Sequence, residues 1–163
     1  MRAGAQDKRP LILGLGNSLM GDDGAGARVV ELLNADPAVT ACADLEWAGT
    51  DLLRSASQLE GRDWVILVDA LESAGQTGQV SVVEDRFAEE RRQQAHWLSA
   101  AQALELLRGV MPALARTRFT WVLVHVGAVR TPASLSAEVE AATIQAAGLI
   151  RALLDQPGRR PAD

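Results

Sequence analysis

The feature that most constrains the fold of this chain is the alternation of short apolar segments with segments of helical periodicity. Five apolar segments are typical of buried strands, at about residues 11–15, 44–47, 64–69, 79–83 and 119–126. Helical patterns follow the first strand, begin near Thr50 and Ser99, and run from about Ser136 to Leu154. Such alternation predicts an α/β domain of three layers, with a mostly parallel sheet covered by helices on both faces. The 79–83 segment alternates only in part, which favours an edge position.

Length and charge narrow the class of protein. A chain of 163 residues is long enough for one domain, and we expect residues 1–9 and 156–163 to be flexible termini. Acidic residues outnumber basic ones by 21 to 16, which argues against a nucleic-acid partner. No apolar run approaches the roughly 18 residues of a membrane span, and the first apolar run is too short for a signal peptide. We therefore expect a cytoplasmic protein with no membrane partner.

Several catalytic chemistries have little support in the composition. Lys8 is the only lysine, there is no tyrosine, and Cys42 is the only cysteine. A lysine Schiff base, a tyrosine general acid and an internal disulfide are therefore not expected. No Gly-x-Ser-x-Gly nucleophile turn occurs, and Cys42 is expected to pack as a small hydrophobic residue.

The turn after the first strand carries the first candidate site. Gly14 and Gly16 begin like the G-x-G-x-x-G fingerprint of dinucleotide-binding proteins, but Leu19 stands where the third glycine belongs. Asp22 and Asp23 follow at the start of the next helix, where they would repel a phosphate. One aspartate is enough for an N-cap, and we assign Asp22 to that role. Asp23 is then either a solvated first-turn acid or a functional carboxylate.

Asp69 is the second candidate, because it ends the most apolar strand of the chain. An aspartate in this position can simply turn the chain. Ligands of open α/β sheets, however, bind beyond the carboxyl ends of the strands, at the crevice where the strand order reverses. In the common doubly wound order the first and third strands flank that crevice. Asp23 follows the first strand and Asp69 ends the third, so this topology brings both carboxylates to one crevice.

Only two histidines are present, His96 and His125. His96 precedes the helix expected near Ser99, and spacing alone leaves open whether it is functional. His125 lies within the last strand, where we expect a hydrogen-bonded, partly buried residue. Together, Asp23, Asp69 and His96 would form a mixed oxygen and nitrogen ligand set. Such a set suits a divalent ion such as nickel, zinc or iron with open positions for a substrate, and it is too sparse for a closed structural zinc site.

Four stretches of the chain resemble one protein family in their order and spacing. They are Leu11–Arg28 (LILGLGNSLMGDDGAGAR), Ala48–Leu53 (AGTDLL), Asp63–Ala70 (DWVILVDA) and His96–Leu104 (HWLSAAQAL). The family is that of the hydrogenase maturation endopeptidases, which trim the precursor of the nickel-containing large subunit of NiFe hydrogenases. The resemblance extends from about Leu11 to Leu154, and its most specific part is the G-x-G-N segment with the acidic residues that follow.

The resemblance implies a fold, a ligand set and an activity. The fold is a twisted five-stranded sheet flanked by helices. Asp23, Asp69 and His96 fall on the family's nickel ligands, and the nickel is carried by the substrate, so no organic cofactor is expected. The implied activity is that of an endopeptidase that removes the C-terminal extension of a nickel-loaded large-subunit precursor, just beyond its Cys-x-x-Cys-x-x-His/Arg motif. The bound nickel serves as the recognition signal. The resemblance assigns no nucleophile, and Asp23 and Asp69 are the candidates for an aspartic-type catalytic role.

Two segments depart from the family's pattern. Members commonly carry an acidic-Gly-Gly-Thr turn after the second strand, where this chain has Trp47-Ala48-Gly49-Thr50 and places Glu46 one position earlier. After the last strand, many members have a Gly-x-x-Pro-Glu-like segment, where this chain has His125–Arg130. If these changes mark a subgroup, His125 could contact the crevice. The three expected ligands are unaffected.

Two other functions are compatible with the sequence. Gly14, Gly16 and the α/β pattern would also fit a Rossmann-type nucleotide-binding oxidoreductase, although the missing third glycine argues against it. A non-catalytic chaperone or docking module for a metalloprotein would use the same three polar residues for binding and would break no bond.

Overall fold

The five apolar segments form one sheet in the strand order β2-β1-β3-β5-β4. The strands are β1 (Leu11–Leu15), β2 (Asp44–Gly49), β3 (Trp64–Glu72), β4 (Val80–Glu84) and β5 (Arg118–Val126). The first three and β5 are parallel, and β4 pairs with β5 antiparallel at the edge. The computed structural model describes residues 9–84, 95–128 and 133–156, and of residues 95–99 only the backbone. The predicted five-stranded, mostly parallel sheet and its edge strand are confirmed.

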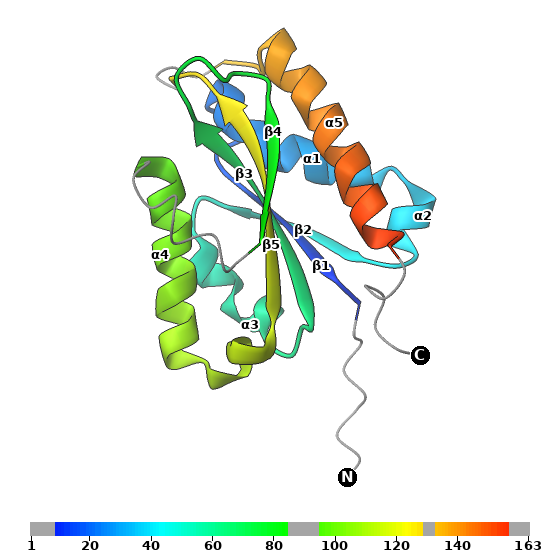
Figure 1. Ribbon diagram of the computed structural model, residues 1–163, viewed down its shortest axis with the longest axis vertical. Helices are drawn as coiled ribbons and strands as arrows, with labels where there is room; N and C mark the ends of the chain where they lie inside the picture. The colour runs from blue at the N-terminus through cyan, green and yellow to red at the C-terminus, as the bar shows by residue number, and fades with distance from the viewer. Residues whose placement is uncertain (1–8, 85–94, 129–132, 157–163) are drawn as a thin grey trace.

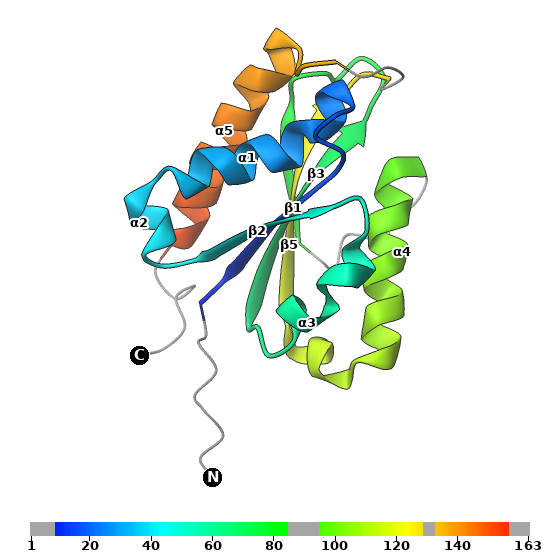
Figure 2. The same cartoon turned by 180° about the vertical axis from the view of Figure 1, so that it is seen from behind.

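Helices cover both faces of the sheet, as predicted (Figures 1 and 2). One face packs against α1 (Ala25–Asn34) and α5 (Ala137–Leu154), with the short α2 (Pro37–Thr40) beside them. The other face packs against α4 (Ala95–Val110) and the 3-10 turn η2 (Leu52–Ser55), which continues into α3 (Ala56–Leu59). Each interface contains its own cluster of buried hydrophobic side chains. No helix in the described residues is long and apolar enough to cross a membrane.

A close contact between two glycines sets α1 against the centre of the sheet. A Cβ atom at Gly26 would lie 2.2 Å from the carbonyl oxygen of Leu15 and 2.6 Å from that of Val68. A Cβ atom at Gly14 would lie 2.5 Å from the carbonyl oxygen of Gly26. These distances leave no room for a side chain. The start of α1 therefore rests directly on β1 and β3, and this contact places the turn before α1 over the carboxyl ends of both strands.

The order of the strands reverses at β1. The chain leaves β1 to form β2 on one side and returns to form β3 on the other, so the crevice expected from the doubly wound topology lies between β1 and β3. The pairing of β1 with β3 ends at Gly14 and Val68, whereas β3 continues beside β5 as far as Glu72. The predicted end of the third strand at Asp69 is therefore wrong by three residues, because β5 is long enough to pair with this extension.

One predicted helix start is also wrong. The helix α4 begins at Ala95 and not near Ser99, so His96 lies in its first turn and not in a preceding loop. No glycine or proline separates Ala95 from Ser99, and nothing in the local sequence stops the helix from extending. The turn near Thr50 is capped by Asp51, whose side chain accepts the backbone N–H of Leu53. For the last helix the prediction is right within one residue, since Ser136 is its N-cap.

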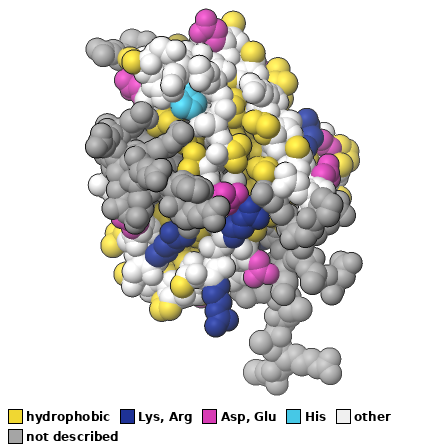
Figure 3. Space-filling view, in the orientation of Figure 1, with side chains coloured by type: hydrophobic (Ala, Val, Ile, Leu, Met, Phe, Trp, Pro, Cys, Tyr) yellow, Lys and Arg dark blue, Asp and Glu magenta, His cyan; other side chains and the backbone are white. Residues whose placement is uncertain are grey.

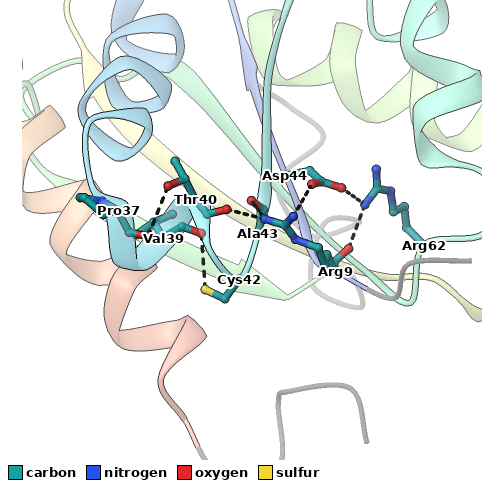
Figure 4. A network of polar contacts seen from close by, with 8 residues as sticks. All are labelled: Arg9, Pro37, Val39, Thr40, Cys42, Ala43, Asp44 and Arg62. Carbon is teal, nitrogen blue, oxygen red and sulfur yellow. Dashed lines mark hydrogen bonds and ion pairs between the residues drawn. The ribbon is translucent and has the colours of Figure 1, made fainter. Parts of the chain in front are cut away.

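A polar network fixes the opposite end of the sheet, at the amino ends of the central strands (Figure 4). Arg62 forms an ion pair with Asp44 and donates to the backbone oxygen of Arg9 at 3.0 Å. Arg9 in turn donates to the backbone oxygen of Ala43 at 2.8 Å. Cys42 is half-buried beside this network and packs against the α1–α5 core, in line with its predicted role. The network therefore holds the first residues of the described chain far from the crevice.

The contact at Gly26 can be tested by adding one methyl group. We expect Gly26→Ala to lower the free energy of unfolding by about 2–3 kcal/mol, because the new Cβ overlaps backbone that cannot move cheaply. The matched control is Gly148→Ala in α5, where a Cβ would have no atom within 4 Å. We expect that variant to gain up to about 1 kcal/mol from helix propensity. Urea unfolding followed by circular dichroism measures both, and equal midpoints for the two variants would contradict the packing described here.

Candidate functional site

Two adjacent cavities open at the carboxyl ends of β1 and β3. The larger has a volume of about 660 Å³ and is bordered by Gly16 and Asp69, by η2 and by α4. The smaller has a volume of about 210 Å³ and is bordered by Asp23 and by residues of the turn before α1. Thr50 and Glu72 border both cavities. The crevice predicted from the sheet topology therefore exists, and it has two compartments.

Asp23 lies in the 3-10 turn η1 (Gly21–Gly24) between β1 and α1. It is only 8% exposed, and its Oδ2 accepts the backbone N–H of Asn17 at 2.8 Å. Gly16 permits this geometry, since its φ is 108° and a Cβ there would lie 2.1 Å from the carbonyl oxygen of Asp23. The solvated first-turn acid is therefore wrong as an interpretation of Asp23. Its carboxylate occupies a backbone donor that a phosphate would need, which disfavours a dinucleotide in this turn.

Asp22 has a different role from the one predicted. Neither η1 nor α1 has a side-chain N-cap. The carboxylate of Asp22 instead accepts the backbone N–H of Ser136 at 2.7 Å and the hydroxyl of the same residue at 3.0 Å. The glycine-bounded turn directs the side chain toward the start of α5, where Gly21 also donates to the carbonyl oxygen of Ala133. Asp22 thus joins the turn that carries Asp23 to the beginning of α5.

Asp69 lies on β3, one residue beyond its last pair with β1. It is 2% exposed, and its Oδ1 accepts the backbone N–H of Ala70 at 2.8 Å. Because β3 continues to Glu72, Asp69 does not turn the chain. A carboxylate offers about four lone-pair positions on its two oxygens, and the bond to Ala70 occupies one of them.

The two histidines differ in how much the structure says about them. The backbone of His96 belongs to the first turn of α4, and its side chain lies outside the described residues. His125 is 4% exposed, as expected for a structural histidine. Its Nε2 lies 2.9 Å from the hydroxyl of Ser81, and its Nδ1 lies 2.9 Å from the hydroxyl of Ser73. His125 borders neither cavity described above.

The electrostatics of the crevice favour a cation. The charged residues that border the two cavities are all acidic within the described chain: Asp23, Asp51, Asp69 and Glu72. On the face shown in Figure 3, the Lys and Arg side chains lie mainly away from the end at which β3 and β5 terminate. No three described side chains of His, Cys, Asp or Glu form a metal-binding group. The side chain of His96 is not among those described, and the ligand set of Asp23, Asp69 and His96 stays a prediction.

Comparisons with known proteins indicate the family to which the chain belongs. No protein-family model matches the chain. The hydrogenase expression/formation protein HupD of Bradyrhizobium diazoefficiens is 33% identical over 100 residues, which span 59% of this chain and about half (52%) of that protein. The NiFe hydrogenase maturation protease HybD from Thermococcus kodakarensis has a TM-score of 0.78 at 28% identity, covering 90% of this chain and 99% of that one.

A further solved structure decides the family. The hydrogenase 2 maturation peptidase from a Thaumarchaeota archaeon is 33% identical, with a TM-score of 0.63, and the match covers 91% of this chain and 99% of that one. The chain belongs to the hydrogenase maturation endopeptidases. The resemblance predicted from the four sequence stretches is therefore confirmed, and so is the family's α/β fold.

The departure of this endopeptidase from the family's acidic-Gly-Gly-Thr turn has a structural counterpart. Trp47 is 51% exposed on β2, and its indole Nε1 donates to the carbonyl oxygen of Gly16 at 3.1 Å. The backbone N–H of Gly16 donates to the carbonyl oxygen of Gly49 at 2.8 Å. Both contacts hold Gly16, whose conformation lets the backbone of Asp23 approach it closely. The tryptophan therefore supports the Asp23 turn from the second strand.

Glu72 and Thr50 border both compartments of the endopeptidase crevice and are not among the site residues that the sequence predicts. A third strand that ends at Asp69 leaves Glu72 outside the predicted crevice. The apolar residues Ala70 and Leu71 continue the strand pattern up to Glu72 and were the available signal. Thr50 follows Gly49, whose φ of 67° reverses the chain at the end of β2.

The bond between Asp22 and Ser136 can be tested with a double-mutant cycle. We expect Asp22→Asn and Ser136→Ala each to lower the free energy of unfolding by about 1 kcal/mol. The double variant should lose less than the sum of the two, because both weaken the bond between the Ser136 hydroxyl and the Asp22 carboxylate. Urea unfolding of the four proteins provides the coupling energy. Strict additivity would show that the bond between the Ser136 hydroxyl and Asp22 does not contribute to stability.

Proposed function

We propose that this endopeptidase removes the C-terminal extension of a nickel-loaded precursor of a NiFe hydrogenase large subunit. Membership of the maturation endopeptidase family supports the reaction class. The observation that carries the site is the placement of two buried carboxylates, Asp23 and Asp69, in adjacent compartments of one crevice whose described charged lining residues are all acidic. The reaction would take place in the cytoplasm.

The nickel ion belongs to the substrate in this proposal. Thiolates of the precursor bind it from one side, and Asp23, Asp69 and His96 contact it from the other. A crevice whose described charged lining residues are all acidic attracts a divalent ion, because opposite charges attract more strongly away from bulk water. A precursor without nickel lacks this attraction, so its scissile bond would not be held at the two carboxylates even where other parts of the precursor bind. Nickel loading is thus recognised before the chain is cut.

Hydrolysis requires a water molecule to add across the scissile peptide bond. The nickel can polarise the scissile carbonyl as a Lewis acid, while an aspartate of the crevice accepts a proton from the attacking water. The nitrogen that leaves then gains a proton. Thr50 carries the only hydroxyl among the described residues that border the two cavities, and no cysteine or serine borders them. The proposal therefore uses water and not a side-chain nucleophile.

The alternatives make different predictions for one experiment. The chain is incubated with nickel-loaded precursor, and the intact masses are measured before and after. An endopeptidase gives one shorter precursor and one C-terminal peptide. A docking module gives a complex with an unchanged precursor mass. An oxidoreductase of Rossmann type would bind NAD(P), which a fluorescence titration detects, and the Asp23 carboxylate at the Asn17 N–H argues against that outcome.

Substitution of the two carboxylates tests their assignment. We expect Asp23→Asn, Asp69→Asn and His96→Ala each to lower kcat/KM for the nickel-loaded precursor by about 100-fold or more, since loss of a hydrogen-bond partner behind a metal ligand already costs about 10- to 100-fold. Glu60→Gln is the charge-matched control, since Glu60 is exposed at the end of α3 and borders neither cavity. Unfolding midpoints show whether each variant is folded. Processing at the normal rate by folded Asp23→Asn and Asp69→Asn would remove the site assignment.

Removal of nickel tests the recognition step. We expect precursor prepared without nickel to remain uncut, and the same precursor to be cut once nickel has been inserted. The mass of the precursor reports both results. Cleavage of nickel-free precursor at a comparable rate would show that the metal is not the signal, while leaving the peptidase activity intact.

A further inference from the structure

The larger cavity extends well beyond the proposed reaction centre. From Asp69 and Gly16 it runs outward as a groove between η2 and α4. Its walls are mainly apolar, with Leu52 and Leu53 on one side and Ala100, Ala103 and Leu106 on the other. A volume of about 660 Å³ is far more than a metal ion or a water molecule needs.

Small side chains on α4 keep this groove open. Two adjacent rows run along the helix at a spacing of three residues. One row is buried in the core: Ala101, Leu104 and Leu107. The other row faces the groove and consists of Ala100, Ala103 and Leu106. Protein interiors are normally filled to crystal-like density, and two alanines at the middle of a helix–turn contact leave this space unfilled.

Exposed leucines flank the groove. Leu53 is 41% exposed and Leu106 is 57% exposed, although both are large hydrophobic residues. Apolar surface of this kind, lying in a cavity and bordered by polar residues, is typical of a binding site. The apolar walls are therefore suited to an apolar segment of a polypeptide.

The charges of the groove specify that segment further. Asp51, Asp69 and Glu72 border it, and no Lys or Arg does within the described residues. Asp51 has a partner in Arg54 at 3.4 Å. Glu72 is exposed and forms no ion pair with a described residue. A basic side chain would complement Glu72, whereas an acidic one would be repelled by all three carboxylates.

We propose that this groove binds the part of the substrate precursor next to the cleaved bond, with an apolar side chain between Leu53 and Leu106 and a basic side chain at Glu72. The inference rests on the proposed function, because the groove opens at Asp69. It assigns Leu53, Leu106 and Glu72 as specificity-determining residues. They act on substrate binding and have no part in the chemical step.

The first experiment uses a matched pair on one helix. Leu106→Asp places a charge in the groove, and Val110→Asp places one at a position that is 67% exposed and does not border the cavity. We expect Leu106→Asp to raise KM for the nickel-loaded precursor at least 10-fold with kcat within twofold, and Val110→Asp to leave both within twofold. Ala103→Phe, which fills the groove without adding charge, should raise KM similarly. Equal KM values for Leu106→Asp and Val110→Asp would overturn the proposal.

The second experiment tests the charge at Glu72 by exchange. We expect Glu72→Lys to raise KM at least 10-fold. Each Lys or Arg of the precursor within six residues of the cut is then changed to Glu, and one of these changes should restore processing by Glu72→Lys while impairing processing by the natural chain. If no such change restores processing, the claim that a basic side chain of the precursor binds at Glu72 is contradicted.

A binding measurement separates this inference from the proposed function. Nickel-free precursor is not cut under the proposed function, so its Kd can be measured by fluorescence anisotropy in the absence of turnover. Weaker binding to Leu106→Asp than to Val110→Asp supports the groove even if no cleavage is ever observed. Equal binding by the two variants, or no binding of the precursor to the natural chain, overturns the groove proposal. The processing assays test the proposed function separately. A dimer of the free chain that Leu106→Asp dissociates would assign the groove to a second copy and would also overturn it.

Discussion

The parallel pairing of β1 with β3 is the constraint on which the crevice depends. These strands are neighbours although β2 lies between them in the sequence. The chain therefore places β2 on one side of β1 and the later strands on the other side. The pairing ends at Gly14 and Val68. The next residues of each strand then diverge, one into the turn that carries Asp23 and the other into Asp69. The close approach of Gly26 to both strands holds the helix that follows at a fixed height above them.

The same topology serves dinucleotide-binding proteins, and local charge makes the difference. In those proteins, free backbone N–H groups at a helix start receive a phosphate. Here the Asn17 N–H is occupied by Asp23, and a second aspartate joins the turn to the start of α5. The turn therefore carries negative charge at the position where dinucleotide-binding proteins have the positive end of a helix dipole. A cation is the ligand that such a turn favours, which agrees with a substrate that carries its own metal ion.

Much of this could be predicted from the sequence, because the signals are local. The pattern of strands and helices is periodic along the chain. The resemblance of four stretches to one family can likewise be recognised without knowing which residues those stretches contact. The misinterpreted residues depend on partners far along the chain. Asp22 was assigned to its own helix because the nearest N–H groups are local, yet its partner Ser136 is more than one hundred residues away. Glu72 is missed because the end of β3 is set by its pairing with β5, and the short apolar segment before Glu72 does not by itself show where the strand ends.

The central claim is that nickel carried by the precursor meets Asp23 and Asp69 of this chain. X-ray absorption at the nickel edge tests it most directly, with the precursor alone and in a complex frozen before cleavage. The account predicts that complex formation adds oxygen ligands at about 2.1 Å, the usual carboxylate distance for a divalent first-row ion, and that Asp23→Asn removes part of that change. Identical nickel spectra for free and bound precursor, with binding demonstrated in the same sample, would contradict it.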